Sequence, residues 1–177
     1  MNFLETNIKG VYEVHFFNAT DDRGSFVKTF HCDSLREAGL NAEFQESFYS
    51  TNKQGVIRGM HFQVPPEDHA KLVYATQGTI LDVILDLRRD SETYGQFAQV
   101  EISGSNFCGV YMPKGVAHGF CCLTEATMVY LTSTQHSPQH DSGIRWDSFG
   151  MDWPVVNPII SVRDQGFEVF SQLESPF

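Results

Sequence analysis

The feature that most limits the fold of this chain is the recurrence of short segments rich in Val, Ile, Tyr, Phe and Thr, with turn residues between them. This pattern is typical of antiparallel sandwiches and barrels. Helical periodicity is scarce, and we expect one short helix at 34–38, with Asp33 as its N-cap and Gly39 as its stop. A second short turn is expected near 164–170. The predicted strands are 10–15, 26–29, 55–62, 70–77, 79–87, 97–103, 107–112, 119–122 and 127–133.

One predicted strand, 79–87, combines apolar residues with two carboxylates. Strict alternation divides its side chains between the two faces of a sheet. One face holds Leu81, Val83, Leu85 and Leu87, and the other holds Ile80, Asp82, Ile84 and Asp86. Carboxylates on an inward face are costly unless they are hydrogen-bonded, but they suit the lumen of a barrel that holds a polar ligand. Two interpretations stay open at this stage: a face toward the lumen, or a face toward solvent.

Length and charge restrict the partners. With 177 residues, the chain is predicted to form one domain, 1–177. The net charge of −10 argues against nucleic acid, because binding to a phosphate backbone draws on clustered Lys and Arg. We find no apolar run of about 18 residues and no signal-type start, so we expect no membrane partner and a cytoplasmic location. The four cysteines lack Cys-x-x-Cys spacing and are expected to be buried free thiols.

Two glycine-containing segments each place a histidine in a strand-like context: Arg58-Gly59-Met60-His61-Phe62-Gln63 and Pro113-Lys114-Gly115-Val116-Ala117-His118-Gly119-Phe120. Alternation puts His61 and Gln63 on one side of the first strand and Arg58 on the other, unless Gly59 marks a bulge. A lone strand histidine is more often a packed core residue than a catalyst. The polar neighbour Gln63 and the second histidine favour a site.

The same segments resemble the two metal motifs of cupin barrels, but only in part. His61-Phe62-Gln63 stands where the leading motif needs His-x-His, whereas the second segment does match Pro-x-Gly-x-x-His. A catalytic metal site needs about three protein ligands, and His69 is expected to lie in a loop. We therefore predict a barrel with histidines and no bound metal. A metal-dependent cupin enzyme remains the main alternative.

Further motifs follow one another in the order found in dTDP-4-dehydrorhamnose 3,5-epimerases, and this resemblance covers nearly the whole chain. It implies a cupin-type jelly roll, a homodimer without metal or other cofactor, and inversion of carbons beside the ketone of a nucleotide diphosphate 4-keto-6-deoxy sugar. Besides the two histidine segments, the motifs are Asp22-Arg23-Gly24, Lys71-Leu72-Val73, Gly78, 82–88, 91–95, 143–147, Trp153-Pro154 and Ser161-Val162-Arg163-Asp164.

The resemblance also assigns roles in the chemistry. Removing a proton beside a ketone needs a positioned base, and a cation or donor must stabilise the enolate oxygen. By resemblance, His61 is the base, Asp164 orients it, and Tyr130 returns a proton from the opposite face. Lys71 would lie near the keto oxygen. Taken alone, a lysine at the start of a strand is usually solvated.

Substrate-binding roles follow in the same way. Arg23 and Arg58 match arginines that hold the pyrophosphate, which suits the planar guanidinium fork. His118 matches a second pocket histidine, and Gln45 and Gln63 are expected to line the pocket. His136 stands where the family has a tyrosine, and the run after Gln45 also departs from the family pattern, so the nucleotide, and whether C3, C5 or both are inverted, stay open. A ketoisomerase and a noncatalytic sugar-binding barrel are further alternatives.

Overall fold

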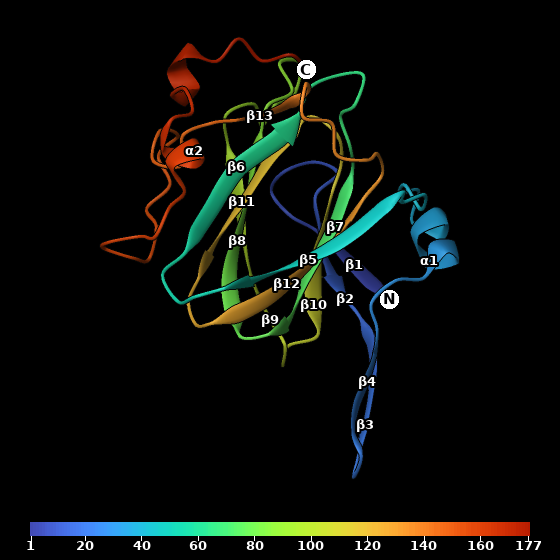
Figure 1. Ribbon diagram of the computed structural model, residues 1–177. Helices are drawn as coiled ribbons and strands as arrows, with labels where there is room; N and C mark the ends of the chain where they lie inside the picture. Colours follow the sequence, from blue (N-terminus) through green and yellow to red (C-terminus); the bar gives the residue numbers. More distant parts are fainter.

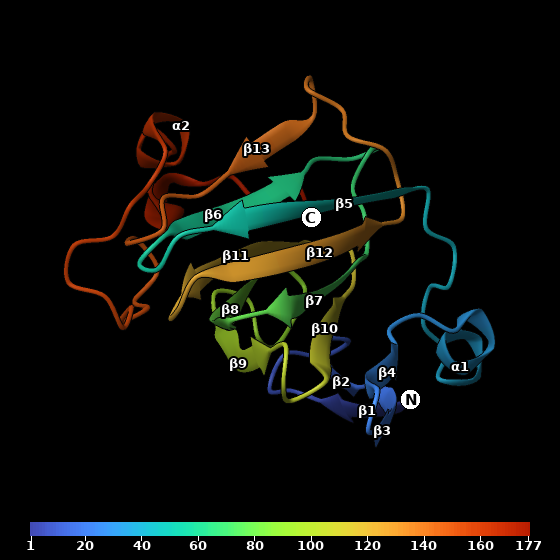
Figure 2. The ribbon, with the colours of Figure 1, turned by 60° about the horizontal axis from the view of Figure 1, so that its bottom comes forward.

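The computed structural model describes residues 1–177 as two facing antiparallel sheets with a separate hairpin (Figures 1 and 2). The hairpin consists of β3 (Phe17–Asp21) and β4 (Gly24–Lys28). The six-stranded sheet runs in the order β1 (Asn2–Glu5), β2 (Tyr12–His15), β10 (Cys108–Met112), β7 (Lys71–Gln77), β12 (Ala126–Thr132) and β5 (Glu46–Asn52). The five-stranded sheet runs β13 (Asp141–Gly143), β6 (Ile57–Gln63), β11 (Val116–Cys122), β8 (Thr79–Asp86) and β9 (Phe97–Ser103).

The main core lies between the two sheets. Ile80 and Ile84 from β8 pack there with Val73 from β7 and with Val110 from β10. Asp82 shares this inward face and is fully buried, so the prediction of a lumen-facing side is confirmed and the solvent-facing alternative is wrong. This arrangement is the all-β, cupin-type jelly roll that the resemblance implied.

The outer face of the five-stranded sheet is also covered. Val83 and Leu85 pack beneath Phe149 and Trp153 from the C-terminal segment. Ile159 of this segment pairs in parallel with Val56, directly before β6. Because both of its faces are buried, β8 is apolar on both sides except for Thr79 and its two aspartates. The same segment brings Asp164 to the outer side of β6.

Each predicted strand overlaps an observed one, but β1, β3, β5 and β13 were missed. Helix α1 (Cys32–Glu37) is capped by His31, whose Nδ1 accepts a hydrogen bond from the Ser34 backbone, so the assignment of Asp33 as N-cap is wrong. The expected turn near 164–170 corresponds to α2 (Val162–Gln165) and the 3₁₀ turn η1 (Phe170–Gln172). Neither α1 nor α2 has the length and hydrophobicity that a bilayer-crossing helix needs.

The β3–β4 hairpin projects away from both sheets (Figure 1). All five residues of β3 are exposed, and Phe26 on β4 is 61% exposed. A two-stranded hairpin is at best marginally stable by itself in water. The hairpin therefore presents apolar surface that the rest of the chain does not cover.

Candidate active site

A cavity of ≈ 390 Å³ opens between the two sheets at the end formed by β5, β12, β6 and β11. Seven of the residues singled out in the sequence line it: Arg58, His61, Gln63, Lys71, His118, Tyr130 and His136. The remaining lining residues are Glu46, Phe48, Ser50, Phe62, His69, Phe120, Thr132, Asp141 and Arg163. Charged and aromatic side chains thus outnumber aliphatic ones, as expected of a site for a polar, ring-containing ligand.

A bulge at Gly59 brings both Arg58 and His61 to the cavity. The pairing of β6 with β11 shifts between His61, which faces His118, and Arg58, which faces Phe120. Gly59 has a positive φ of 126°, and a Cβ there would lie 2.5 Å from the Cα of Gly119, so no larger residue fits. The extra residue changes the alternation of the strand. The bulge that the sequence offered as a possibility is therefore present, and Arg58 does not point away.

His61 is held by Asp164. The imidazole Nε2 lies 2.9 Å from Asp164 Oδ1, and Asp164 Oδ2 accepts a hydrogen bond of 3.1 Å from the Gly59 backbone. Burial opposes ionisation of Asp164, but its hydrogen bonds, the one from His61 foremost, lower its pKa. With Nε2–H donated to this carboxylate, Nδ1 is left as the nitrogen with a free lone pair. The pair therefore places an imidazole that can accept a proton in the cavity wall.

Tyr130 stands on the opposite wall, on β12. Its hydroxyl lies 3.1 Å from Ser50 Oγ, and its ring stacks on Phe48 with centroids 4.7 Å apart and an interplanar angle of 14°. Burial raises the pKa of Tyr130, so the phenol stays protonated at neutral pH. A positioned, protonated phenol is a proton donor. The cavity therefore has an imidazole with a free lone pair on one sheet and a protonated phenol on the other.

Lys71 and His118 lie near each other between these walls. Burial lowers the pKa of Lys71 to about 8, against the opposing charges of Asp141 and Asp82. His118 Nε2 lies 2.7 Å from Asp82 Oδ1, and burial lowers the pKa of His118 although this carboxylate opposes the shift. His118 is therefore neutral at pH 7, whereas Lys71 is still mostly charged. A charged lysine in the wall of the cavity can act on a developing oxyanion.

Asp164 is not among the lining residues and contacts the cavity only through His61, and two further residues singled out in the sequence lie outside it. Gln45 precedes β5, and its neighbour Glu46 lines the wall instead, because alternation along β5 turns Glu46, Phe48 and Ser50 inward. Arg23 is on the distant hairpin, 89% exposed, and its guanidinium pairs with Asp21 at 2.6 Å. Both assignments therefore need correction within a single chain: Gln45 is replaced by Glu46, and Arg23 cannot reach the cavity of its own chain.

Gln63 lines the cavity but is occupied by the protein. Its Nε2 donates to the carbonyl of Glu67 at 2.7 Å, and its Oε1 accepts from the Ser137 backbone at 2.7 Å. Gln63 therefore stabilises the loop that contains His136 through its hydrogen bond with Ser137. The backbone N–H of His136 also donates to Glu46 Oε2 at 2.8 Å.

The sequence analysis missed several cavity residues. Arg163 pairs with Asp141 at 2.7 Å and supplies a second guanidinium beside Arg58. The signal for it was its place directly before Asp164. His69 lies in a loop, as expected, but this loop also lines the cavity. Burial lowers the pKa of His69 to about 3, so it is a neutral imidazole.

Nε2 of His61 and Nε2 of His118 are each directed at an aspartate, and the cavity histidines are not among the side chains whose metal-ligating atoms converge. The only group of three side chains with convergent metal-ligating atoms is Glu13, His15 and Cys108, at a different place in the fold. The fold and the cavity together define a cupin-type barrel enzyme with acid and base side chains on opposite walls.

Comparison with known proteins gives the family. Residues 5–172 match the family model described as dTDP-4-dehydrorhamnose 3,5-epimerase. The chain is 38% identical over 170 residues to a Shigella flexneri protein of that name, covering 93% of each chain. It is 34% identical over 169 residues to a dTDP-4-dehydrorhamnose 3-epimerase of Streptomyces niveus, covering 93% of this chain and 82% of that one.

Comparison with solved structures gives the same family. An epimerase from Legionella pneumophila, in complex with dTDP-4-keto-L-rhamnose, superposes with a TM-score of 0.93 at 29% identity, covering 98% of this chain and 94% of that one. The chain belongs to the dTDP-4-dehydrorhamnose 3,5-epimerase family. It is an isomerase that epimerises a nucleotide diphosphate 4-keto-6-deoxy sugar.

Proposed function

We propose that this chain, acting as one domain over 1–177, inverts both C3 and C5 of a dTDP-4-keto-6-deoxy sugar, with His61 as base and Tyr130 as acid. The observation that carries the proposal is the placement of the His61–Asp164 pair and Tyr130 on opposite walls of one cavity. Inversion requires that a proton leave one face of the sugar and return to the other. Two side chains of opposite function on facing sheets meet this requirement.

The reaction follows from these positions. His61 Nδ1 takes the proton from the carbon beside the ketone, and the imidazolium that forms is stabilised by Asp164. The electron pair moves onto the ketone oxygen, where the ammonium of Lys71 offsets the charge. Tyr130 then donates its proton to the opposite face of the carbon. Before the second inversion, the imidazolium releases its proton to solvent and the Tyr130 phenolate takes one up. The reset groups then serve the other carbon, since C3 and C5 both flank the one carbonyl.

The nucleotide end of the substrate is proposed to lie toward the mouth of the cavity. Arg58, whose Nε donates to Asn52 at 2.6 Å, and Arg163 provide two guanidinium groups for the pyrophosphate. His136 offers an aromatic face to the base. Thymidine is proposed because the matching family and the relatives act on dTDP sugars.

We further propose a homodimer in which the hairpin of one chain reaches the cavity of another. The support is the projecting hairpin with its exposed Phe17 and Phe26, and the guanidinium of Arg23 at its tip. A partner would cover these apolar side chains and gain a third cation for the pyrophosphate. A cytoplasmic location is also proposed, because all four cysteines are free thiols, as is usual in a reducing compartment.

Solvent deuterium exchange tests the proposal. The purified chain is incubated in D₂O with dTDP-, UDP- and CDP-linked 4-keto-6-deoxy sugars, and incorporation at C3 and C5 is read by NMR. We expect incorporation and inversion at both carbons of the dTDP sugar, and none with His61→Asn. His31→Asn is the matched control, because asparagine also serves as an N-cap. The absence of exchange at both carbons of every sugar would overturn the epimerase proposal, and exchange at C3 alone would overturn the assignment of two centres.

A further inference from the structure

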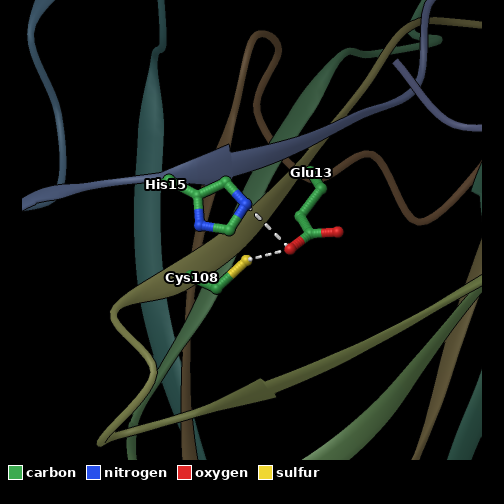
Figure 3. Close-up of side chains that lie close together, drawn as sticks. All are labelled: Glu13, His15 and Cys108. Carbon is green, nitrogen blue, oxygen red and sulfur yellow. Dashed lines mark hydrogen bonds and ion pairs between the residues drawn. The ribbon is translucent and has the colours of Figure 1, made fainter. Parts of the chain in front are cut away.

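A second group of reactive side chains lies on the six-stranded sheet, outside the cavity. Glu13 and His15 are two residues apart on β2 and therefore share a face, and His15 pairs in register with Cys108 on β10. Figure 3 shows the carboxylate, the imidazole and the thiol directed at one point. His15 Nε2 lies 3.0 Å and Cys108 Sγ 3.4 Å from Glu13 Oε1.

The spacing fits a tetrahedral ion. All three donor atoms lie within 4.8 Å of one another. Zinc bonds of about 2.0 Å to nitrogen or oxygen and about 2.3 Å to sulfur place neighbouring donors roughly 3.3–3.6 Å apart. Two of the observed separations are already close to this range. Glu13 and His15 are partly exposed, so small side-chain rotations suffice for the third.

The chemical types of the three ligand atoms indicate which metal ion the group would bind. A thiolate with an imidazole favours zinc over magnesium or calcium, which prefer oxygen ligands. One thiolate and one carboxylate also balance the two charges of the ion. Cys108 is only 2% exposed, whereas His15 and Glu13 reach the surface, so three protein ligands would form the inner side and solvent the fourth.

We propose that Glu13, His15 and Cys108 form a zinc site that ties β2 to β10 at the base of the projecting hairpin. On binding, the thiol proton of Cys108 passes to solvent and the sulfur bonds to the ion. The hairpin strand β3 begins at Phe17, two residues after His15, so the ion anchors the hairpin where it leaves the sheet. This proposal is independent of the catalytic roles assigned above.

Cobalt substitution tests the site. Chelator-treated protein is titrated with Co²⁺, and we expect one equivalent per chain to give a thiolate-to-cobalt charge-transfer band and tetrahedral visible bands, both removed by added Zn²⁺. Cys122→Ser is the matched control, because Cys122 is equally buried at 1% exposure but is not part of the cluster. It is expected to keep the bands.

Cys108→Ser is expected to lose the charge-transfer band. His15→Gln changes a partly exposed residue and is expected to weaken binding at least tenfold, which covers the case in which Cys108→Ser does not fold. Cobalt held only by the cavity histidines gives no sulfur band. The absence of that band in the unmodified protein, or its persistence in both cluster variants, overturns the proposal.

Discussion

His61 and His118 face each other across the β6–β11 pair, and each directs Nε2 at its own aspartate. The two pairs differ in their surroundings. His118 is buried with Asp82, whereas His61 is partly exposed to the cavity. Both line the cavity, but the His61 side chain is 28% exposed and the His118 side chain only 5%, so His61 is the more accessible to a substrate.

Asp164→Asn tests this relationship. Without the carboxylate, the imidazolium that forms on proton abstraction loses its partner, and the tautomer of His61 is no longer fixed. We expect turnover to fall by about 10²-fold or more, with a much smaller change in KM. Asp147→Asn removes an exposed carboxylate paired with Arg145 at 2.6 Å and is expected to leave turnover unchanged. Equal rates for Asp164→Asn and the unmodified protein would contradict the role.

Tyr130→Phe separates proton removal from proton return. Phenylalanine keeps the stacking on Phe48 and loses only the hydroxyl. We expect inversion to fall by about 10²–10⁴-fold, because the acid is missing, while His61 still exchanges the substrate proton with D₂O. Ser50→Ala removes the hydrogen-bond partner of the phenol and is expected to have a milder effect. If Tyr130→Phe loses deuterium exchange as well as inversion, Tyr130 would be needed for proton removal too.

The lowered pKa of Lys71 predicts that kcat falls at alkaline pH. Burial lowers the pKa of Lys71 to about 8, so its charge is present below that pH and lost as the pH rises through it. We expect kcat to decline above about pH 8 as the enolate loses its counter-charge. Lys71→Arg, which stays charged, is expected to be slower but to lack this limb. A limb at the same pH in Lys71→Arg would show that another group causes it.

The strands that could be predicted from the sequence are those with two apolar faces or with clear alternation of apolar and polar residues. β8 is an example: alternate residues pack on two cores, and Asp82 points into the lumen as the pattern indicated. β5 was missed because its residues are mostly polar. Its inward side carries Glu46, Phe48 and Ser50, since it forms the wall of a polar cavity and not of the core. A strand that lines a polar site therefore lacks the alternation of apolar residues by which strands are predicted.

Only those features of the site that depend on residues close together in the sequence were predictable from the residues alone. Gly59 signalled the bulge that turns Arg58 toward the cavity. The contact between His61 and Asp164 spans 103 residues, and the sequence supplied it only through the family resemblance. Arg23 was placed in the pocket by the same resemblance, but its hairpin leads away from the body of its own chain. Long-range register leaves no local pattern.

Asp86 is expected to control stability in acid. Burial opposes its ionisation, but hydrogen bonds from Arg88, Ser91 and Thr93 lower its pKa to about 2. Its stabilisation is therefore fully present above the unfolded value of about 4 and is lost as the pH falls toward 2. Asp86→Asn should lower the free energy of unfolding by about 2 kcal/mol at pH 7, measured by urea denaturation. The difference from the unmodified chain should shrink as the pH falls from 4 to 2, and a constant difference would contradict this origin.

Mixed dimers test whether Arg23 serves the partner's cavity. Arg23→Ala alone is expected to raise KM about tenfold or more by removing a charge-assisted contact to the pyrophosphate. His61→Asn alone is expected to be inactive. If Arg23 crosses to the partner, a dimer of one chain of each kind contains one cavity with both residues intact.

Because random exchange of equal amounts makes half of the dimers mixed, the mixture should regain about a quarter of the fully functional cavities of the unmodified protein. These cavities are recognised by their low KM. If Arg23 acts within its own chain, no cavity in the mixture has both residues, and no low-KM activity returns. Phe26→Asp, which puts a charge on the exposed apolar face of the hairpin, serves as the second variant and is expected to produce monomers by analytical ultracentrifugation.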